Sequence, residues 1–423
     1  MRSDFADEIA KKCLAHYQNL PKKGKPVPDK EWTLLSSVVT SLDRKLSVVA
    51  MATGTKCLGR SGMSPRGDLV NDSHAEVLAR RCFLRYLYDQ ISKFKQTGDS
   101  DIITGLDDQH RYEINSKVEF HFYTSHVPCG DAAIIPKEET CKGKRKLESN
   151  EEVTTKRKRM DAVQPNKTEC SRDIGPLDAG DSEKKGVEDD IMETLDHCVG
   201  EVIGDVYRTG AKCVTGQDSR LPGALYHTVG AVRTKPGRGD PTLSVSCSDK
   251  MARWVACGLQ GALLSLLLSR PVLLSSVVIG SGGPYSQDVL QRAIITRTGT
   301  SHSPHLLHSS VIFPHSRYNN PTSRPCPSSI LWALVPHKPL EVCVEGRRQG
   351  VTKKCRDNGR LMVCKMELLR SFLEVSGDRF QRMAYRDIKA SADQYRINWT
   401  QTRSRLGAWT TKPYHLEHFN INE

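Results

Sequence analysis

Four residues far apart in the sequence have side chains suited to zinc-assisted hydrolysis. His74 and Glu76 stand two residues apart, and Cys129 and Cys247 each lie in a run of small residues. Imidazole and thiolate are preferred zinc ligands, and a catalytic zinc ion held by three protein ligands keeps a position for water. Zinc makes that water acidic enough to supply hydroxide at neutral pH, while a nearby carboxylate carries its proton. The pattern therefore predicts a zinc site at His74, Cys129 and Cys247, with Glu76 as the proton carrier.

The spacing of these residues is typical of hydrolytic nucleobase deaminases. In such enzymes a His ligand precedes by two residues a Glu that does not touch the metal, and a Pro-Cys dipeptide opens a second helix. Pro128-Cys129 fits this pattern, and a position at a helix N-terminus would lower the pKa of the thiol. The usual motif continues as Pro-Cys-x-x-Cys, but residue 132 is Ala. Cys247 is the best candidate for the third ligand, because it follows a predicted strand over 243–245 and begins a Ser-Asp helix start.

Each part of this pattern has an ordinary structural explanation when it is taken alone. A His-x-Glu triplet is frequent in a chain with fourteen histidines, and a single cysteine is more often a core residue than a ligand. Three such features in one order, each at a predicted helix start, make a chance combination the weaker explanation.

The surrounding sequence predicts the elements that would hold these side chains. β-Branched runs and period-2 alternation indicate strands, and apolar residues at helical spacing after Asn71-Asp72-Ser73 indicate a helix. Strands are predicted over 37–40, 47–52, 118–124 and 272–280, and helices near the N-terminus, over 74–95, from 246 to 263 and in the C-terminal region.

Composition and charge restrict the class of protein. With 38% hydrophobic residues the chain can bury a sizeable core, and its net charge of +13 favours a polyanionic partner such as nucleic acid. The most apolar stretch, 261–279, is interrupted by Arg270 and Pro271, so no membrane span is expected. The chain starts without an apolar leader, and its fourteen cysteines are expected to be mostly reduced. An intracellular location, in the nucleus, the cytoplasm or both, is therefore expected.

Two segments depart from the composition of the rest. Residues 137–189 are rich in Lys, Glu, Asp and Ser and lack aromatic residues, which predicts a disordered insertion within one domain spanning 1–423. Its basic clusters at 142–146 and 156–159 are compatible with a nuclear-import signal or with a solvated charged loop. Residues 300–330 are rich in His, Ser and Pro and are predicted to form a loop.

Three motifs carry a resemblance to a known family, and the resemblance covers most of the chain. They are Asn71-Asp72-Ser73-His74-Ala75-Glu76, Pro128-Cys129-Gly130-Asp131-Ala132 and Ser246-Cys247-Ser248-Asp249-Lys250. These motifs resemble the deaminase domain of the adenosine deaminases that act on RNA. The resemblance implies an α/β fold with a cytidine-deaminase-like, three-layer mixed sheet flanked by helices and a helical C-terminal extension.

The family resemblance also implies a buried inositol hexakisphosphate. Buried cations without partners would each cost several kcal/mol, so an internal polyanion is a reasonable companion for them. Two positions depart from the family pattern: Ala262 stands where Ser is frequent, and Trp399 stands where a late helix supplies Lys. Asp72 and Lys235 resemble a relay between this pocket and the metal site. The residues expected to line the pocket are Asn71, Arg80, Arg81, Lys250, Arg253, Trp254, Gln260, Lys365, Tyr385, Lys389, Tyr395, Trp409 and Lys412.

The substrate expected from the resemblance is tRNA. Duplex-editing relatives place a Glu on a loop that fills the space of a flipped base, whereas the comparable loop here carries Arg238. The segments around Thr55-Lys56 and Lys235 also resemble the tRNA-acting members, so Thr55, Lys56 and Arg238 are candidates for substrate contact or the relay. By resemblance the product is inosine at adenosine 37, beside the anticodon of an alanine tRNA. Duplex-RNA adenosine editing and cytidine deamination are the alternatives within catalysis, and an inactive RNA-binding zinc protein is the alternative outside it. No protein partner is evident.

Overall fold

The computed structural model describes residues 2–137, 205–207, 209–216, 218, 226–237, 239–319, 321–351 and 359–421. Apart from residues 138–204, the chain forms one compact unit made of residues 1–137 and 205–423. Of the insertion predicted over 137–189, residues 138–189 with both basic clusters lie outside the described residues, and so does Arg238. None of the described helices combines the length and apolar composition that crossing a bilayer requires.

The fold is built on a mixed sheet of eight strands in the order β14-β13-β8-β2-β3-β16-β17-β18. The two neighbouring pairs β8–β13 and β13–β14 are parallel, and the remaining pairs are antiparallel. The strands of this sheet are β2 (Leu35–Leu42), β3 (Lys45–Thr53), β8 (Glu119–Thr124), β13 (Ser276–Ser281), β14 (His305–Ile312), β16 (Ser328–Ala333), β17 (Leu340–Val344) and β18 (Arg347–Arg348).

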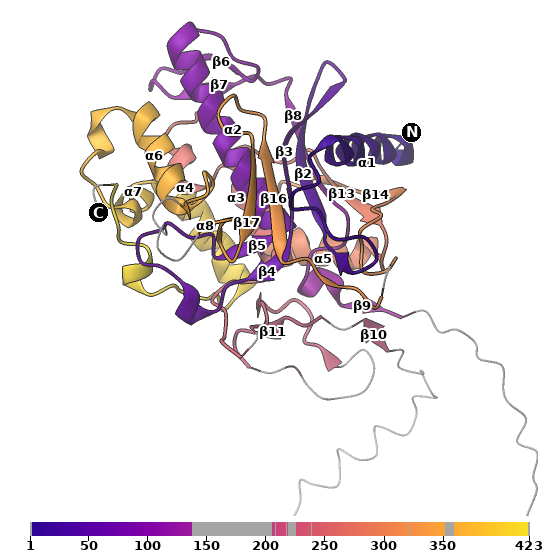
Figure 1. The fold of residues 1–423 in the computed structure, drawn as a ribbon. Coiled ribbons are helices and arrows are strands. Elements are labelled where there is room, and N and C mark those ends of the chain that lie inside the picture. Colours follow the sequence, from indigo (N-terminus) through magenta and orange to yellow (C-terminus); the bar gives the residue numbers. More distant parts are fainter. Residues whose placement is uncertain are drawn as a thin grey trace, which may run out of the picture. The chain divides into compact units, whose positions relative to one another are not determined.

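Helices cover both faces of this sheet, which gives the three layers that the sequence predicts (Figure 1). The helices are α1 (Arg2–Asn19), α2 (Ala75–Thr97), α3 (Cys247–Cys257), α4 (Gly261–Ser265), α5 (Gln287–Ile294), α6 (Lys365–Ser376), α7 (Tyr385–Ala390) and α8 (Asp393–Leu406). The short strands outside the main sheet are β1 (Glu31–Trp32), β4 (Thr55–Cys57), β5 (Asp72–His74), β6 (Ile103–Leu106), β7 (Tyr112–Ile114), β9 (Ile135–Pro136), β10 (Val206–Tyr207), β11 (Lys212–Cys213), β12 (Arg233–Thr234) and β15 (Arg324–Pro325).

The protein has a larger and a smaller hydrophobic core, and the alternation of side chains along the central strands explains why there are two. Ala50 and Ala52 of β3 pack with α2 and the other helices of the larger core, while Met51 between them faces the smaller core under α1. Strands with apolar residues on both faces must be covered on both sides, because side chains alternate along a strand. The three-layer α/β prediction is therefore confirmed.

The prediction that residues 300–330 form a loop is wrong. They contain β14, which pairs in parallel with β13, and β15, which pairs with β1. β14 is an edge strand whose residues are mostly exposed or half-buried, so it needs no continuous apolar run. Helix α1 lies against this edge, where the Asp7 carboxylate accepts hydrogen bonds from Ser309 and Ser310.

Two further local predictions are corrected. The helix expected to open at Cys129 is a single 3-10 turn, Asp131–Ala133. The strand expected over 243–245 is reduced to one bridge between Val245 and Thr234. Only the helix start at Cys247 has the expected cap: the Ser246 hydroxyl accepts a hydrogen bond from the backbone N–H of Asp249.

A buried ion pair fixes the β11–β12 hairpin that carries Lys235. The fully buried Arg233 donates two hydrogen bonds of 2.6 Å to the Asp218 carboxylate. Burial opposes ionisation of this carboxyl, but the hydrogen bonds and charge of Arg233 outweigh it and hold the pKa of Asp218 below its usual range.

The Asp218→Asn substitution is predicted to destabilise the protein in a pH-dependent way. The pKa of Asp218 is lower in the folded than in the unfolded state. The contribution of its charge to the free energy of unfolding is therefore complete above pH about 4 and is lost as the pH falls below that value. Urea unfolding of both proteins between pH 7 and pH 3 measures this. The difference in unfolding free energy should shrink on acidification, and a difference that grows would contradict the assignment.

Candidate active site and its basic cavity

The His-x-Glu motif is positioned by the small β4–β5 pair and the start of α2. Thr55 of β4 pairs with His74, the last residue of β5, and the backbone N–H of Ala75 donates to the Gly54 carbonyl at 3.0 Å. A Cβ on Gly54, which has φ +146°, would lie 2.0 Å from the Ser73 carbonyl oxygen, so a larger residue does not fit. Glu76 then falls in the first turn of α2, where it is buried and its Oε2 has no hydrogen-bond partner among the described residues.

The two predicted cysteine ligands lie in contact. The backbone N–H of Cys247 donates to Cys129 Sγ at 3.3 Å, and the backbone N–H of Ser248 donates to the Cys129 carbonyl. Gly130 permits this approach, because a Cβ there, at φ +104°, would lie 2.2 Å from Ser246 Oγ. Residues 118 positions apart are thus brought together by backbone contacts.

The electrostatics of the cysteine pair differ from the expected helix-dipole effect. A hydrogen bond from the Cys247 thiol lowers the pKa of Cys129 to about 6, with help from the positive charge of Lys235. Burial and the same hydrogen bond raise the pKa of Cys247. Cys129 is therefore the more acidic thiol of the pair.

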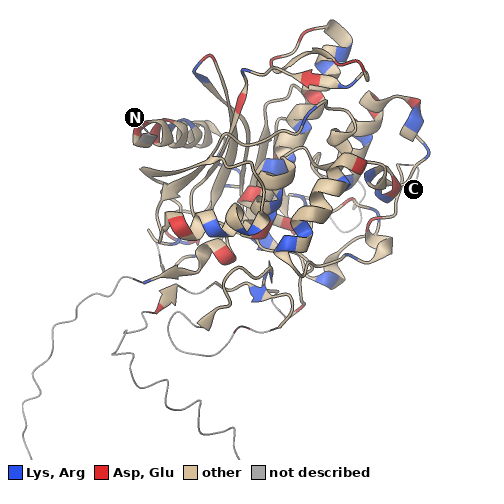
Figure 2. Cartoon of the chain, turned by 180° about the vertical axis from the view of Figure 1, so that it is seen from behind, with Lys and Arg blue, Asp and Glu red and all other residues tan. Residues whose placement is uncertain are grey.

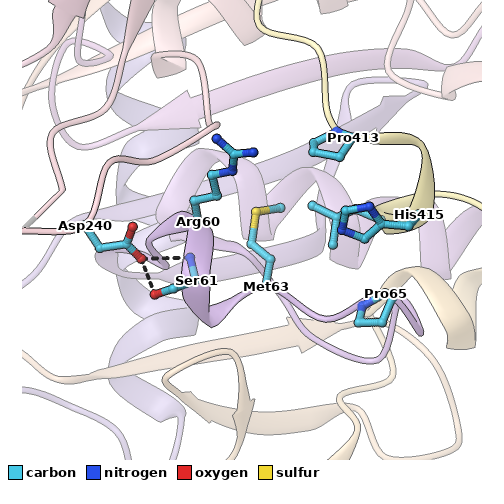
Figure 3. A pocket seen from close by; sticks show the side chains of 8 residues that line it. Arg60, Ser61, Met63, Pro65, Asp240, Pro413 and His415 are labelled. Atoms are coloured by element: carbon cyan, nitrogen blue, oxygen red, sulfur yellow. Dashed lines mark hydrogen bonds between the residues drawn. The ribbon is translucent and has the colours of Figure 1, made fainter.

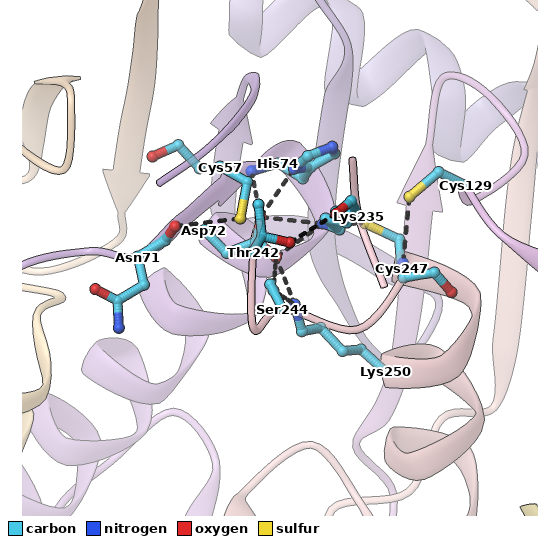
Figure 4. Close-up of polar contacts among 12 residues, drawn as sticks. Cys57, Asn71, Asp72, His74, Cys129, Lys235, Thr242, Ser244, Cys247 and Lys250 are labelled. Atoms are coloured by element: carbon cyan, nitrogen blue, oxygen red, sulfur yellow. Dashed lines mark hydrogen bonds and ion pairs between the residues drawn. The ribbon is translucent and has the colours of Figure 1, made fainter. Parts of the chain in front are cut away.

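A buried carboxylate, Asp72, links the predicted zinc ligands (Figure 4). Its Oδ1 accepts hydrogen bonds from the His74 backbone N–H at 3.0 Å and from His74 Nδ1 at 2.8 Å. Because a carboxylate can only accept, Nδ1 carries the proton and Nε2 remains free as a donor to a metal. The Lys235 ammonium lies 2.8 Å from Asp72 Oδ2 and donates to Cys247 Sγ at 3.1 Å.

The ammonium groups around Asp72 stabilise its negative charge. Burial opposes its ionisation, but Lys235 and Lys250 outweigh burial and keep the pKa of Asp72 well below its usual range. The Ser244 hydroxyl donates to the same carboxylate at 2.6 Å, a contact that the sequence did not indicate. Lys250 bonds Asp72 as well and also lines the neighbouring cavity, so one carboxylate connects the cavity to His74 and Cys247.

The donor groups fit zinc by their chemistry, although their present arrangement is not a complete metal site. Among the described residues, no group of three or more His, Cys, Asp and Glu side chains stands in an arrangement that could hold a metal ion. One imidazole with a free Nε2 and two neighbouring cysteine thiols are nevertheless suitable ligands, since a coordinated thiol loses its proton. The orphaned Glu76 Oε2 beside them is the buried acceptor that a bound water would satisfy.

All thirteen residues predicted to hold a polyanion line one cavity of about 530 Å³. Among the described residues that line it, ten are Lys or Arg and two are acidic, Asp72 and Glu417. Figure 2 shows basic segments gathered on the helices in the middle of the molecule, whereas acidic segments are more scattered. Four charged lining residues, Arg386, Arg396, Arg403 and Glu417, were not predicted; the available signal was the spacing of Arg396 and Arg403, about two turns apart along the sparsely apolar α8.

The cations of this cavity are incompletely neutralised by the protein. Burial lowers the pKa of Arg80 to about 10 and holds that of Lys412 well below its usual range, with the charges of neighbouring cations adding to the effect. Lys365 and Lys389 both pair with Glu417, at 3.0 and 3.4 Å. Burial opposes ionisation of this carboxyl, but the positive charges of the two lysines outweigh burial and lower the pKa of Glu417 to about 2. Arg81 Nη2 is buried with no acceptor in the described part of the chain.

Both residues that depart from the family pattern, Ala262 and Trp399, line this cavity. Arg253 stacks over the Trp399 ring at 4.1 Å and donates to the Tyr395 hydroxyl at 3.1 Å. The aromatic ring therefore holds an arginine where the family supplies a lysine. Ala262 lines the cavity as a small apolar residue.

A second hollow of about 530 Å³ lies beside the loop expected to face RNA (Figure 3). Asp240, which ends that loop, accepts hydrogen bonds from the Ser61 backbone N–H at 2.8 Å and from the Ser61 hydroxyl at 2.5 Å. The contact anchors residues 235–240 to residues 59–65. Lys235 at the other end of the loop belongs to the buried site, and Lys56 is half-buried in β4 next to Thr55.

The three-layer sheet and the paired thiols beside a His-x-Glu helix start define the class as a deaminase-type α/β protein. The adenosine-deaminase (editase) domain model matches residues 50–413. The chain is 37% identical, over 97% of its length and 99% of the relative's, to tRNA-specific adenosine deaminase 1 of Macaca fascicularis. The enzyme of the same name in Drosophila melanogaster is 32% identical, with 98% and 96% covered.

A more distant relative marks the breadth of this group. The double-stranded RNA-specific adenosine deaminase of Mus musculus is 26% identical over 88% of this chain, which spans 29% of that protein. The chain therefore belongs to the adenosine-deaminase (editase) domain family, and the resemblance predicted from its three motifs is confirmed.

The Asp72→Asn substitution is predicted to destabilise the protein strongly. Asn keeps the shape of Asp72 but removes the charge that the buried Lys235 and the half-buried Lys250 require, and breaking a buried pair costs about 3–5 kcal/mol. Urea unfolding at pH 7 measures the loss. Asp99→Asn is the matched control, because Asp99 is 81% exposed in its pair with Lys93 and should leave the unfolding midpoint nearly unchanged. Equal effects of the two substitutions would contradict the role given to Asp72.

Proposed function

We propose that this protein deaminates adenosine to inosine in tRNA, with zinc and Glu76 as the chemical groups. The observation that carries the proposal is the contact of Cys129 with Cys247 beside the buried carboxylate of Glu76, whose Oε2 has no partner among the described residues. Relatives named as tRNA-specific adenosine deaminases, matched along almost their whole length, support the choice of substrate. The resemblance further favours adenosine 37 of an alanine tRNA as the position.

The proposed reaction adds water to the adenine ring and releases ammonia. His74, Cys129 and Cys247 would hold zinc, which when bound supplies the acidity that yields hydroxide at neutral pH. Glu76 Oε2 takes one proton from the water and delivers it to the ring nitrogen N1, and it then takes the remaining proton of the hydroxyl on C6 and delivers it to the departing amino group. The water oxygen becomes bonded to C6 and the bond between C6 and the amino nitrogen breaks. Asp72 keeps the His74 imidazole in the tautomer with a free Nε2.

We also propose that the basic cavity binds inositol hexakisphosphate. Ten lining cations with two acidic partners, together with the orphaned Arg81 Nη2, support a polyanion with many phosphate groups. Such a ligand would neutralise the charge of Lys250. Asp72 would then interact mainly with Lys235 and His74. The polyanion would therefore influence the zinc ligands through one shared carboxylate.

The substrate is tested with purified protein on tRNA and on a perfect RNA duplex, with inosine and uridine scored separately. We expect inosine in tRNA and little in the duplex; comparable duplex activity, or uridine formation, would favour the alternative substrates. Glu76→Gln should lower the rate by about 10²–10⁴-fold, because the proton carrier is lost. Unchanged turnover in this variant would refute the assigned role, and an inactive wild-type protein that binds tRNA would support the inactive RNA-binding alternative.

The zinc and polyanion proposals are tested together by elemental analysis of the purified protein. We expect stoichiometric zinc and the phosphorus content of a hexakisphosphate. Cys247→Ala should lose zinc because a catalytic site needs three protein ligands, and Cys257→Ala, at a buried cysteine on the same helix, is the matched control that keeps it. Full zinc in Cys247→Ala would show that the third ligand is wrong, and protein free of phosphorus would refute the polyanion.

A further inference from the structure

Two aromatic rings are stacked where β8 and β13 end. The rings of His126 and Tyr318 lie 5.4 Å apart, centroid to centroid, with an interplanar angle of 24°. Gly283 lies against both rings, because a Cβ there would be 2.8 Å from the Tyr318 ring and 3.2 Å from the His126 ring. The stack therefore rests directly on backbone.

This stack begins beside the proposed catalytic carboxylate. His126 follows β8 and precedes Cys129 by three residues, and the charge of Glu76 reaches its imidazole. The carboxyl ends of parallel strands β8 and β13 meet here, at the edge of a sheet where α/β proteins place their ligands. The rings lead from the reacting centre outward.

Several buried polar atoms around the stack have no hydrogen-bond partner among the residues that the structure describes. The carbonyl groups of Ser125 and Gly282 lie near His126, but neither buried ring nitrogen makes a hydrogen bond of good geometry within the described chain. Ser316 Oγ is also buried and unpartnered there, and a Cβ on Gly282 would lie 3.7 Å from it and 3.2 Å from the His126 ring. Buried polar groups are normally satisfied, so these atoms point to a ligand that offers both donors and acceptors.

The outer part of the stack is open to solvent and continues into a second tyrosine. Tyr318 is 55% exposed and Tyr207 of β10 is 41% exposed. Tyr207 lies near Tyr318, and Arg317 is the chain neighbour of Tyr318. The Lys137 ammonium lies 5.8 Å from the Tyr207 ring centroid, although it is also paired with Asp205. His126, Tyr318 and Tyr207 together are called the aromatic track below.

We propose that the aromatic track binds the single-stranded nucleotides that flank the reacting adenosine, an inference that rests on the proposed function. Exposed aromatic rings bordered by cations are the usual means of holding unpaired bases, because every base has a face to stack. Tyr318 stacks on the nucleobase next to the adenosine and Tyr207 on the following one. His126 supports Tyr318 from below and offers its ring nitrogens to the edge or sugar of the nearer nucleotide.

The aromatic track explains why a folded RNA with unpaired bases would be preferred. In a duplex the base faces are occupied by their neighbours, so stacking on Tyr318 would require several bases to be opened. In an anticodon-type loop the bases are already accessible. The track therefore makes substrate choice depend on unpaired neighbours of the adenosine.

The test compares Tyr318 variants in binding and catalysis. The probe is a fluorescent RNA hairpin with an adenosine in its loop, bound to the Glu76→Gln protein, and inosine formation is measured with Glu76 intact. Tyr318→Ala should raise Kd and KM by about 5- to 150-fold, the value of one stacked base, with a smaller change in kcat. Tyr318→Trp and Tyr318→Phe should bind within a few-fold of the wild-type protein, because both keep a ring.

Tyr414→Ala is the matched control. Tyr414 is 56% exposed and is also stacked on a histidine, His418, in another part of the chain. An unchanged Kd and KM in Tyr318→Ala, an equal loss in Tyr318→Phe, or an equal loss in Tyr414→Ala would overturn the track. Failure of the wild-type protein to form inosine in tRNA would instead refute the proposed function, while hairpin binding would still test the track.

Discussion

The site is organised around the buried negative charge of Asp72. This carboxylate takes hydrogen bonds from the His74 backbone and imidazole, from the Lys235 and Lys250 ammonium groups and from the Ser244 hydroxyl. Each partner comes from a different part of the chain, and each would be costly to bury alone. Charge pairing, as well as apolar packing, therefore holds together β5, the segment around Lys235 and α3.

The same charge balance extends into the basic cavity. Lys250 belongs to both places, while Glu417 meets Lys365 and Lys389 on the far side. The cavity is built from α2, α3 and the C-terminal helices, which are distant in sequence. Under the proposal, a polyanion would act as a structural centre for these elements and would set the electrostatics of the metal ligands through Lys250 and Asp72.

Sequence patterns predicted the site more fully than the outer fold. His74, Glu76 and the helix start at Cys247 could be recognised because caps and ligand spacing are local, and the cavity residues followed from the family motifs. Edge strand β14 was missed because backbone pairing with β13, not apolar content, makes it a strand. The helix expected at Cys129 failed because Gly130 is required by the approach of Ser246, a long-range constraint. Ser244 and Glu417 act through partners that only the folded chain supplies.

The close approach at Gly130 has a consequence for how the chain can vary in length. Direct hydrogen bonds between the segments that carry Cys129 and Cys247 fix the distance between these two residues, and Gly130 packs against Ser246. Their spacing is therefore independent of the contour length of the polypeptide that joins them, including residues 138–204. Loop closure grows costlier only slowly with length, so insertions or deletions between these two cysteines can accumulate during evolution while the spacing of the sulfur atoms stays fixed.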